Sequence, residues 1–232
     1  MPVPLLSGKV YIVGFGLKRH NGTMAAALIP LFPLEVVVFP RTALPLHIFE
    51  ERYKKMVTEA IAGASEFGVV LAKANGIVNA GCTVTVEKLV QTYADGRMDI
   101  LTRGHRRFEV GALDQELEIL RAEVRYFDDD DFTPVPAELR QQAIAYFVEM
   151  SKLESPRGRG EADLSDPQIS FQLAQDLPDL DFLHSLLRQR SEAGRLRELN
   201  QYLSRYVPRQ QRIEKVKSIA PTNGFAGKHP GH

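Results

Sequence analysis

Short apolar runs and alternating apolar and polar residues dominate the first 130 residues of the chain. Thr83–Val90 and Leu120–Tyr126 alternate at a period of two, which is typical of a strand with one buried face. Further strands are predicted at 27–32, 44–48, 67–71 and 98–102, with the last one continuing through Phe108 and Val110. Asp95-Gly96 is the pair that a two-residue hairpin turn favours, because both central residues need positive φ. The sequence therefore predicts a sheet with a tight hairpin at this pair.

The remaining pattern is helical. Apolar residues spaced by three and four predict one helix over 49–61, among the strands. After the four aspartates Asp128–Asp131 the helical period continues to the end of the patterned region, with further helices around 139–148, 169–177 and 183–187. Asp166 and Ser191 are candidate helix caps, and Pro208 is expected to kink or end the last long helix. Strands followed by helices predict an α+β fold.

These patterns divide the chain into four predicted parts. Residues 28–130 carry the strands, and residues 131–216 carry the helices. Residues 1–27 show no sustained period and are expected to be a disordered or non-native extension, with Met24 as an alternative start. Residues 217–232 are expected to form a disordered tail, since they end in Gly, Pro and Lys. The two patterned parts should pack together, because short helices cannot bury their apolar stripes alone.

Composition narrows the class of protein. The 232 residues are 44% hydrophobic and 25% charged, as in an ordinary globular protein. Lys plus Arg balance Asp plus Glu at 29 each, so no net charge draws the chain to nucleic acid or to an anionic membrane. A single cysteine, Cys82, excludes an internal disulfide, and no apolar run reaches the 18 residues of a membrane span. We expect a cytoplasmic protein without a membrane partner.

Several segments carry a family resemblance, among them the following three. Residues 29–41 read IPLFPLEVVVFPR, residues 44–53 read LPLHIFEERY, and residues 103–110 read RGHRRFEV. Together they strongly resemble the N-terminal, substrate-binding domain of the Lon protease family, and the helical half resembles that of stand-alone bacterial members; the resemblance covers roughly residues 28–210. It implies a PUA-like β-barrel followed by a helical bundle. It also implies a non-catalytic module that binds unfolded or damaged polypeptide.

Motifs for catalysis are missing from the sequence. Two Gly-Lys pairs occur, Gly8-Lys9 and Gly227-Lys228. Neither belongs to a phosphate-binding P-loop, because the required Ser or Thr and the first glycine are absent. Ser151 and Lys152 are adjacent, so on a helix they point about 100° apart and make a poor nucleophile–base pair. The histidines lack the paired spacing of metal ligands. His47 is expected to be a satisfied core or near-core group and Cys82 a buried small residue. We therefore expect no enzyme activity, no metal and no cofactor.

A binding site is predicted at two loops of the strand-rich half, where an exposed aromatic side chain and nearby arginines could hold a peptide. Its residues are Phe39, Pro40, Arg41, Arg103, His105, Arg106 and Arg107. Two alternatives remain open. Phe32 and Phe39 are equally compatible with core positions, and the basic cluster with pairing to carboxylates such as Glu50 and Glu87.

The expected partners are unfolded protein clients, with a separate protease or chaperone as a further candidate. The alternative function is RNA binding, because PUA-like folds elsewhere bind RNA and Arg103–Arg107 is a basic cluster. Analogy of fold is a weak argument, and the neutral net charge counts against nucleic acid.

Overall fold

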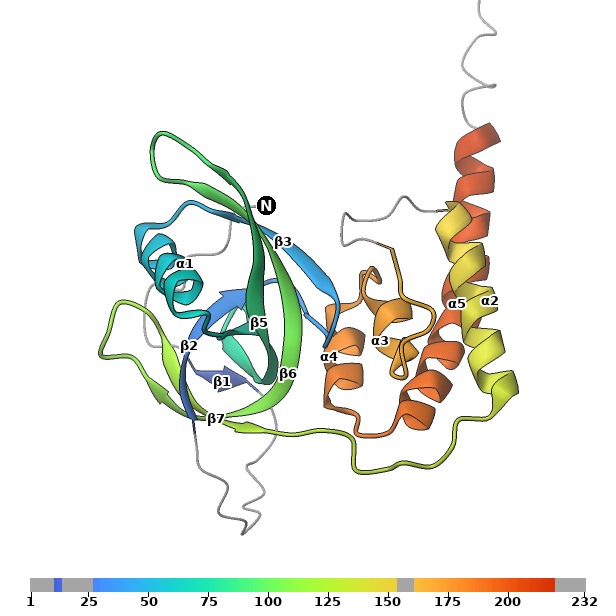
Figure 1. Cartoon of the computed structure of the whole chain (residues 1–232). Coiled ribbons are helices and arrows are strands. Elements are labelled where there is room, and N and C mark those ends of the chain that lie inside the picture. Colours follow the sequence, from blue (N-terminus) through green and yellow to red (C-terminus); the bar gives the residue numbers. More distant parts are fainter. Residues whose placement is uncertain (1–10, 14–26, 154–160, 220–232) are drawn as a thin grey trace, which may run out of the picture.

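The protein is an α+β fold in which a sheet lies beside a group of helices (Figure 1). The computed structural model describes residues 11–13, 27–153 and 161–219. Most of the predicted extension and tail lies outside these residues. Ile12–Val13 form a strand, so the expected lack of structure in the extension is wrong there. The last helix runs to Ile219, beyond the expected start of the tail at 217.

Seven described strands form one mixed sheet. They are β1 (Ile12–Val13), β2 (Ala27–Leu34), β3 (Ala43–Ile48), β4 (Phe67–Lys73), β5 (Gly76–Thr92), β6 (Met98–Asp114) and β7 (Arg121–Tyr126). The pairs β1–β5 and β2–β4 are parallel, and the other pairs are antiparallel. An additional pairing of β5 with β6 makes a closed series, in which β5, β4, β2, β7 and β6 each pair with the next. Each strand predicted from the sequence overlaps one of these.

The hairpin between β5 and β6 turns differently from the prediction. Gly96 has a φ of 80°, but Asp95 is not among the residues with positive φ. The Tyr93 N–H donates to the Arg97 carbonyl at 2.8 Å, and the Gly96 N–H donates to the Tyr93 carbonyl at 2.9 Å. The loop is therefore longer than a two-residue turn and needs one left-handed glycine only, so the prediction of two positive φ angles is wrong.

The described helices are α1 (Glu51–Gly63), α2 (Ala137–Leu153), α3 (Ile169–Ala174), α4 (Leu180–Arg188) and α5 (Glu192–Ile219). Ser191 caps α5 as predicted, since its Oγ accepts a hydrogen bond from the Gly194 N–H at 3.1 Å. Asp179 caps α4 by accepting from the Phe182 N–H. Asp166 does not cap a helix, because α3 begins only at Ile169. Pro208 does not end α5, which continues for eleven residues beyond it.

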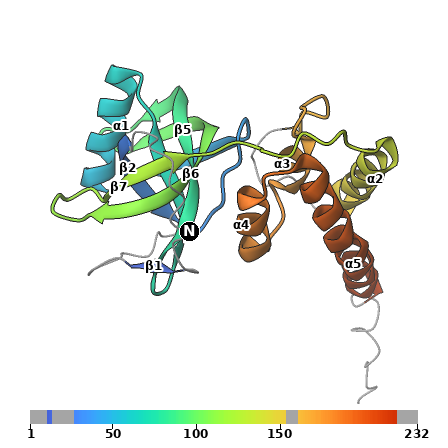
Figure 2. The same ribbon diagram turned by 90° about the horizontal axis from the view of Figure 1, so that it is seen from below.

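One hydrophobic core extends through both halves of the molecule, and α3 and α4 lie nearest to the sheet (Figure 2). Phe39 from the sheet half stacks on Phe171 of α3, with ring centroids 4.9 Å apart and an interplanar angle of 18°. A second, smaller core lies within the sheet around Leu31 and Phe108. The predicted packing of the two halves against each other is confirmed.

Candidate functional site

The aromatic part of the predicted binding site is buried. Phe39 is 0% exposed and Phe32 is 3% exposed, and Pro40 is also buried. Phe32 packs on Tyr53 of α1 with ring centroids 4.1 Å apart. Neither phenylalanine can contact a client from these positions. The prediction that Phe39 and Pro40 form an exposed patch is wrong, and the core alternative is correct, because helix α3 covers the loop.

Arg41 and Arg103 are partly exposed, but both are engaged. Arg41 donates from Nε and Nη2 to the two carboxylate oxygens of Asp166, each at 2.7 Å. Arg103 forms an ion pair with Glu87, as the pairing alternative predicted, and donates to the Arg41 carbonyl at 2.9 Å. Glu50 was the other suggested partner of the basic cluster, and it pairs with Arg52 instead.

His105 and Arg106 share a single carboxylate. His105 Nδ1 lies 2.7 Å from Glu66 Oε1, and Arg106 Nη2 lies 3.4 Å from Glu66 Oε2. Burial opposes ionisation of Glu66, but hydrogen bonds from Thr83 and His105 and the nearby Arg106 charge outweigh it, so its pKa is lowered. The Arg106 guanidinium also lies 3.7 Å from the centroid of the Tyr126 ring. These contacts fix the side chains of His105 and Arg106 on the surface of the sheet.

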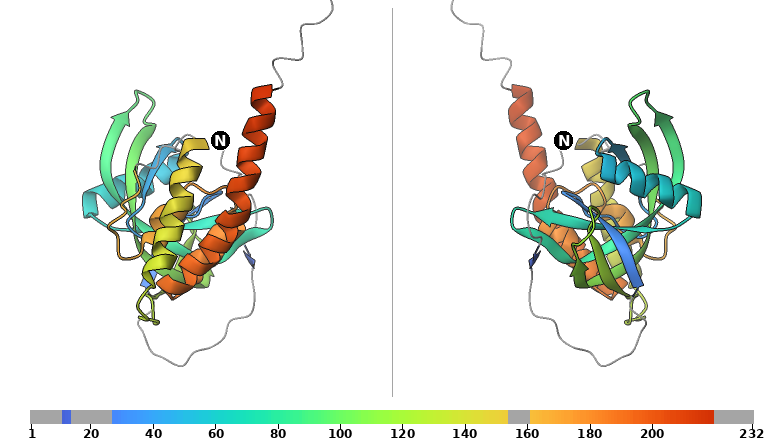
Figure 3. Two further views of the ribbon diagram at one scale, coloured as in Figure 1. Left: turned by 90° about the vertical axis from the view of Figure 1, so that its right-hand side faces the viewer. Right: turned by 90° about the vertical axis from the view of Figure 1, so that its left-hand side faces the viewer.

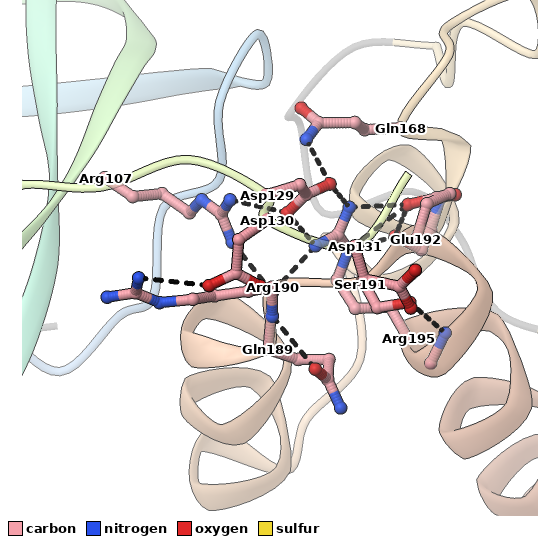
Figure 4. Close-up of polar contacts among 12 residues, drawn as sticks. Arg107, Asp129, Asp130, Asp131, Gln168, Gln189, Arg190, Ser191, Glu192 and Arg195 are labelled. Carbon is pink, nitrogen blue, oxygen red and sulfur yellow. Dashed lines mark hydrogen bonds and ion pairs between the residues drawn. The ribbon is translucent and has the colours of Figure 1, made fainter. Parts of the chain in front are cut away.

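Arg107 belongs to a buried ion cluster that joins the sheet to the helices (Figure 4). Its side chain is 1% exposed, and it donates to Asp129 at 2.6 Å and to the carbonyl oxygens of Leu187 and Gln189. Asp129 also accepts two hydrogen bonds from Arg195 of α5, at 2.6 and 2.7 Å, and Arg195 is 0% exposed. The prediction that Arg107 contacts a client is wrong, because it lies inside this junction.

The two linking segments complete the junction. Asp130 and Asp131, which follow β7, contact Arg190 and Ser191, which precede α5. Glu192 accepts hydrogen bonds from Ser170 and Arg195, and its burial raises its pKa. The seven residues predicted as one site thus do not form one exposed surface. Three are buried, and the other four each contact a carboxylate.

Two further side chains can be placed. Cys82 is buried as predicted, and burial raises the pKa of its thiol to about 12, so it is a poor nucleophile. His47 lies in β3 and contacts Asp99 at 2.6 Å, so it is satisfied as expected, but its side chain is 44% exposed, so the expected core or near-core position is wrong. Among the described residues, no three His, Cys, Asp or Glu side chains are grouped as metal ligands. None of the described helices is long and apolar enough to cross a bilayer.

An open groove of about 530 Å³ lies between α4 and α5. Its lining residues come from the start of α4 and from one face of α5: Asp179, Phe182, Glu198, Gln201, Tyr202, Arg205, Tyr206 and Arg209. Three of its aromatic rings are stacked in a row. Phe182 and Tyr202 have centroids 4.3 Å apart at 9°, and Tyr202 and Tyr206 have centroids 5.5 Å apart at 23°. The groove thus offers aromatic surface bordered by charges of both signs.

The sequence contained a signal for this groove that the sequence analysis missed. The α5 lining residues are spaced by three and four, so they share one face of the helix. A second stripe with the same period, Leu196, Leu199, Leu203 and Val207, faces the core. The stripe of buried leucines is the stronger periodic signal of this helix. In the sequence, Tyr202 and Tyr206 therefore look like the edge of that core-facing stripe.

Residues 28–216 match the sequence model of a protein family described as the ATP-dependent protease La (LON) substrate-binding domain. Among solved structures, the chain is similar to the Lon N-terminal domain protein from Xanthomonas campestris, with a TM-score of 0.60 and 26% identity, over 75% of this chain and 96% of that one. It also has the fold of the N-terminal domain of Mycobacterium avium complex Lon protease, with a TM-score of 0.56 and 15% identity, over 77% and 98% of the two chains. What these comparisons match is the substrate-binding domain and not a protease or ATPase domain. Since the family model spans most of the sequence, the chain belongs to the Lon substrate-binding domain family.

Proposed function

We propose that this protein recognises unfolded or damaged polypeptide, without catalysing a reaction, and that the groove between α4 and α5 is its binding site. Membership of a substrate-binding family supports a role in recognising protein substrates. The observation that carries the choice of site is the row of stacked rings, Phe182, Tyr202 and Tyr206, in an open groove.

The chemistry of the groove suits polypeptide. Aromatic rings give a large contact area at a low cost in conformational entropy. The bordering Arg205 and Glu198 can meet backbone carbonyl and N–H groups as well as charged side chains. Unfolded chains vary in sequence, so such a site should be weak and tolerant, with a dissociation constant in the micromolar range, or about −8 kcal/mol.

RNA binding has less support. The alternative rested on the basic cluster, but Arg103, Arg106 and Arg107 are each paired with a carboxylate. A phosphate at this cluster would have to displace those carboxylates. We therefore retain RNA as a competitor in the experiments rather than as a second function.

Finer features of the fold belong to the same proposal. We interpret the closed series of pairings among β5, β4, β2, β7 and β6 as the PUA-like β-barrel that the resemblance implies. We interpret α2 to α5 as its helical bundle. A cytoplasmic location and a separate protease or chaperone as partner also remain proposals.

The test uses the full chain and a permanently unfolded client, such as reduced and carboxymethylated lactalbumin. Tyr206→Ala should weaken binding several-fold, because it removes one ring of the stacked row. Tyr146→Ala is the matched control, since Tyr146 is a partly buried tyrosine on α2 outside the groove. Absence of binding by the parent protein would contradict the function, and equal binding by both variants would contradict the site. ATP and casein should not be hydrolysed by the purified protein.

A further inference from the structure

The groove face of α5 continues toward the end of the helix as an apolar stripe that is half-buried at its start and exposed at its end. Tyr202 and Tyr206 are followed by Ile213, 36% exposed, and Val216, 67% exposed. At 100° per residue all four fall on one side of the helix. Figure 3 shows that the last turns of α5 project beyond the other helices. The stripe therefore extends the groove toward the exposed end of α5.

Three arginines follow the same stripe. Arg205, Arg209 and Arg212 are exposed and are spaced by four and three residues, so they share this face of α5. In the part of the chain that the structure describes, none of them takes part in an ion pair or a hydrogen bond. Arg41 and Arg103, by contrast, are each paired with a carboxylate. These three arginines thus place positive charge along the stripe without a direct ion-pair partner among the described residues.

Negative charge lies at the groove itself. Glu198 is one turn before Tyr202 on α5, and Asp179 is at the start of α4. The charge along α5 consequently runs from negative near Glu198 to positive at Arg212. From Tyr202 to Val216 the helix rises about 21 Å, which an extended segment of about six residues would span.

We propose that the stripe and groove of α5 select polypeptide segments that carry carboxylate side chains among aromatic or aliphatic ones. This inference rests on the proposed function and names its substrate class. The apolar side chains of the client pack on the tyrosines, Ile213 and Val216, and its carboxylates accept hydrogen bonds from the three arginines, whose planar guanidinium groups suit bidentate contact. Glu198 repels acidic residues at the other end, so the carboxylates lie toward the end of the helix.

The experiment compares two labelled 12-residue peptides with identical Phe and Leu positions, one with Glu and one with Lys at the remaining positions. The full chain should bind the Glu peptide about tenfold or more tightly at low salt. The difference should shrink as the salt concentration rises toward 0.5 M, because these charges are solvent-exposed.

Charge reversal tests the arginines directly. The double variant R205E/R209E should weaken binding of the Glu peptide by about tenfold or more and strengthen binding of the Lys peptide. The control K55E/K152E makes the same change in net charge at exposed lysines on α1 and α2, and it should leave both affinities within about twofold. Circular dichroism and thermal unfolding would check that both double variants are folded.

Several outcomes would overturn the proposal. Equal affinity for the two peptides, or equal effects of the two double variants, would show that the stripe does not select acidic segments. A 12-nucleotide oligouridylate that competes with the Glu peptide would reassign the stripe to nucleic acid, and self-association abolished by R205E/R209E would reassign it to a second copy of the chain. If lactalbumin binding persists in any of these cases, the proposed function survives without this inference. If the parent binds neither peptide and no unfolded client, the proposed function and this inference are both wrong.

Discussion

Replacing Asp129 by Asn should destabilise the protein through its buried junction. The Asp129 carboxylate accepts hydrogen bonds from Arg107, from Arg195 and from the Gln168 side chain at 2.8 Å. The two guanidinium groups are 1% and 0% exposed. In the variant both cations stay buried, and the new amide N–H₂ must face one of these donors. Arg195 keeps Glu192 as a partner, whereas Arg107 keeps only carbonyl oxygens.

The magnitude can be bracketed from two directions. Burial opposes ionisation of Asp129, but hydrogen bonds from Arg195 and Gln168 and the charges of Arg195 and Arg107 outweigh it and lower its pKa to about 2. Relative to a value near 3.8 in the unfolded chain, this shift corresponds to about 2 kcal/mol of stability. Breaking a buried ion pair by removing one partner costs about 3–5 kcal/mol. We expect a loss of about 2–5 kcal/mol for Asp129→Asn.

The loss should depend on pH. The folded pKa of Asp129 is lower than the unfolded pKa, so its contribution is complete above about pH 5 and is lost as the pH falls toward 2. About 1 kcal/mol of it should be gone by pH 3. Burial raises the pKa of Glu192, so that carboxylate acts with the opposite sign, but it is present in both proteins. The stability difference between parent and variant should therefore shrink on acidification.

Urea unfolding followed by circular dichroism, at pH 7, 5 and 3, measures this difference. Asp130→Asn is the matched control, because the neighbouring Asp130 is 66% exposed and its contact with Arg190 is 3.3 Å long. It should change the free energy of unfolding by less than about 1 kcal/mol. The reasoning is refuted if Asp129→Asn costs no more than the control, or if its cost stays constant between pH 7 and pH 3.

Three further outcomes are expected. Phe39→Ala should destabilise the fold by about 3–5 kcal/mol in urea unfolding, since it empties a fully buried position against Phe171; a loss under 1 kcal/mol would contradict this role. Gly104→Ala should cost about 1–3 kcal/mol, because an added Cβ would lie 1.9 Å from the Phe39 carbonyl oxygen, whereas Gly63→Ala, with nothing closer than 3.8 Å, should be nearly neutral by the same measurement. Deleting residues 1–23 should lower the melting temperature by a few degrees, because it removes the strand beside β5, and an unchanged value would mean that β1 contributes nothing.

The strands and helices could be predicted because each depends on a local pattern. A run of six buried residues, Phe67 to Ala72, makes up all of β4 except Lys73, and the Ser191 hydroxyl needs only the N–H of Gly194, three residues away. The hairpin prediction also rested on a local pattern. It was wrong in detail, because the Asp-Gly pair is equally compatible with a longer loop. A local pattern thus determines which helix or strand forms, but it determines the type of connecting turn less strictly.

The binding site could not be predicted in the same way, because burial depends on distant partners. Phe39 is covered by Phe171, which lies 132 residues later, and Arg107 meets Arg195 through Asp129. Nothing near Phe39 in the sequence distinguishes a core phenylalanine from an exposed one. The stripe on α5 could in principle be predicted, because its spacing is local, but the same helix carries a stronger apolar stripe that faces the core.

The segments 29–41, 44–53 and 103–110, which carry much of the family resemblance, and the proposed binding site on α5 lie on different parts of the molecule, although the family model spans both. These three segments supply Phe39, Arg41 and Arg107, whose side chains attach the sheet to α3, to Asp166 before α3 and to the end of α4. Substituting them should alter client binding only indirectly, by loosening the junction. The arginines along α5 are exposed and lie outside the core, so these charges can change while the fold remains. A difference in clients between two proteins of this architecture should then follow the outer face of α5, and not residues 29–41, 44–53 and 103–110.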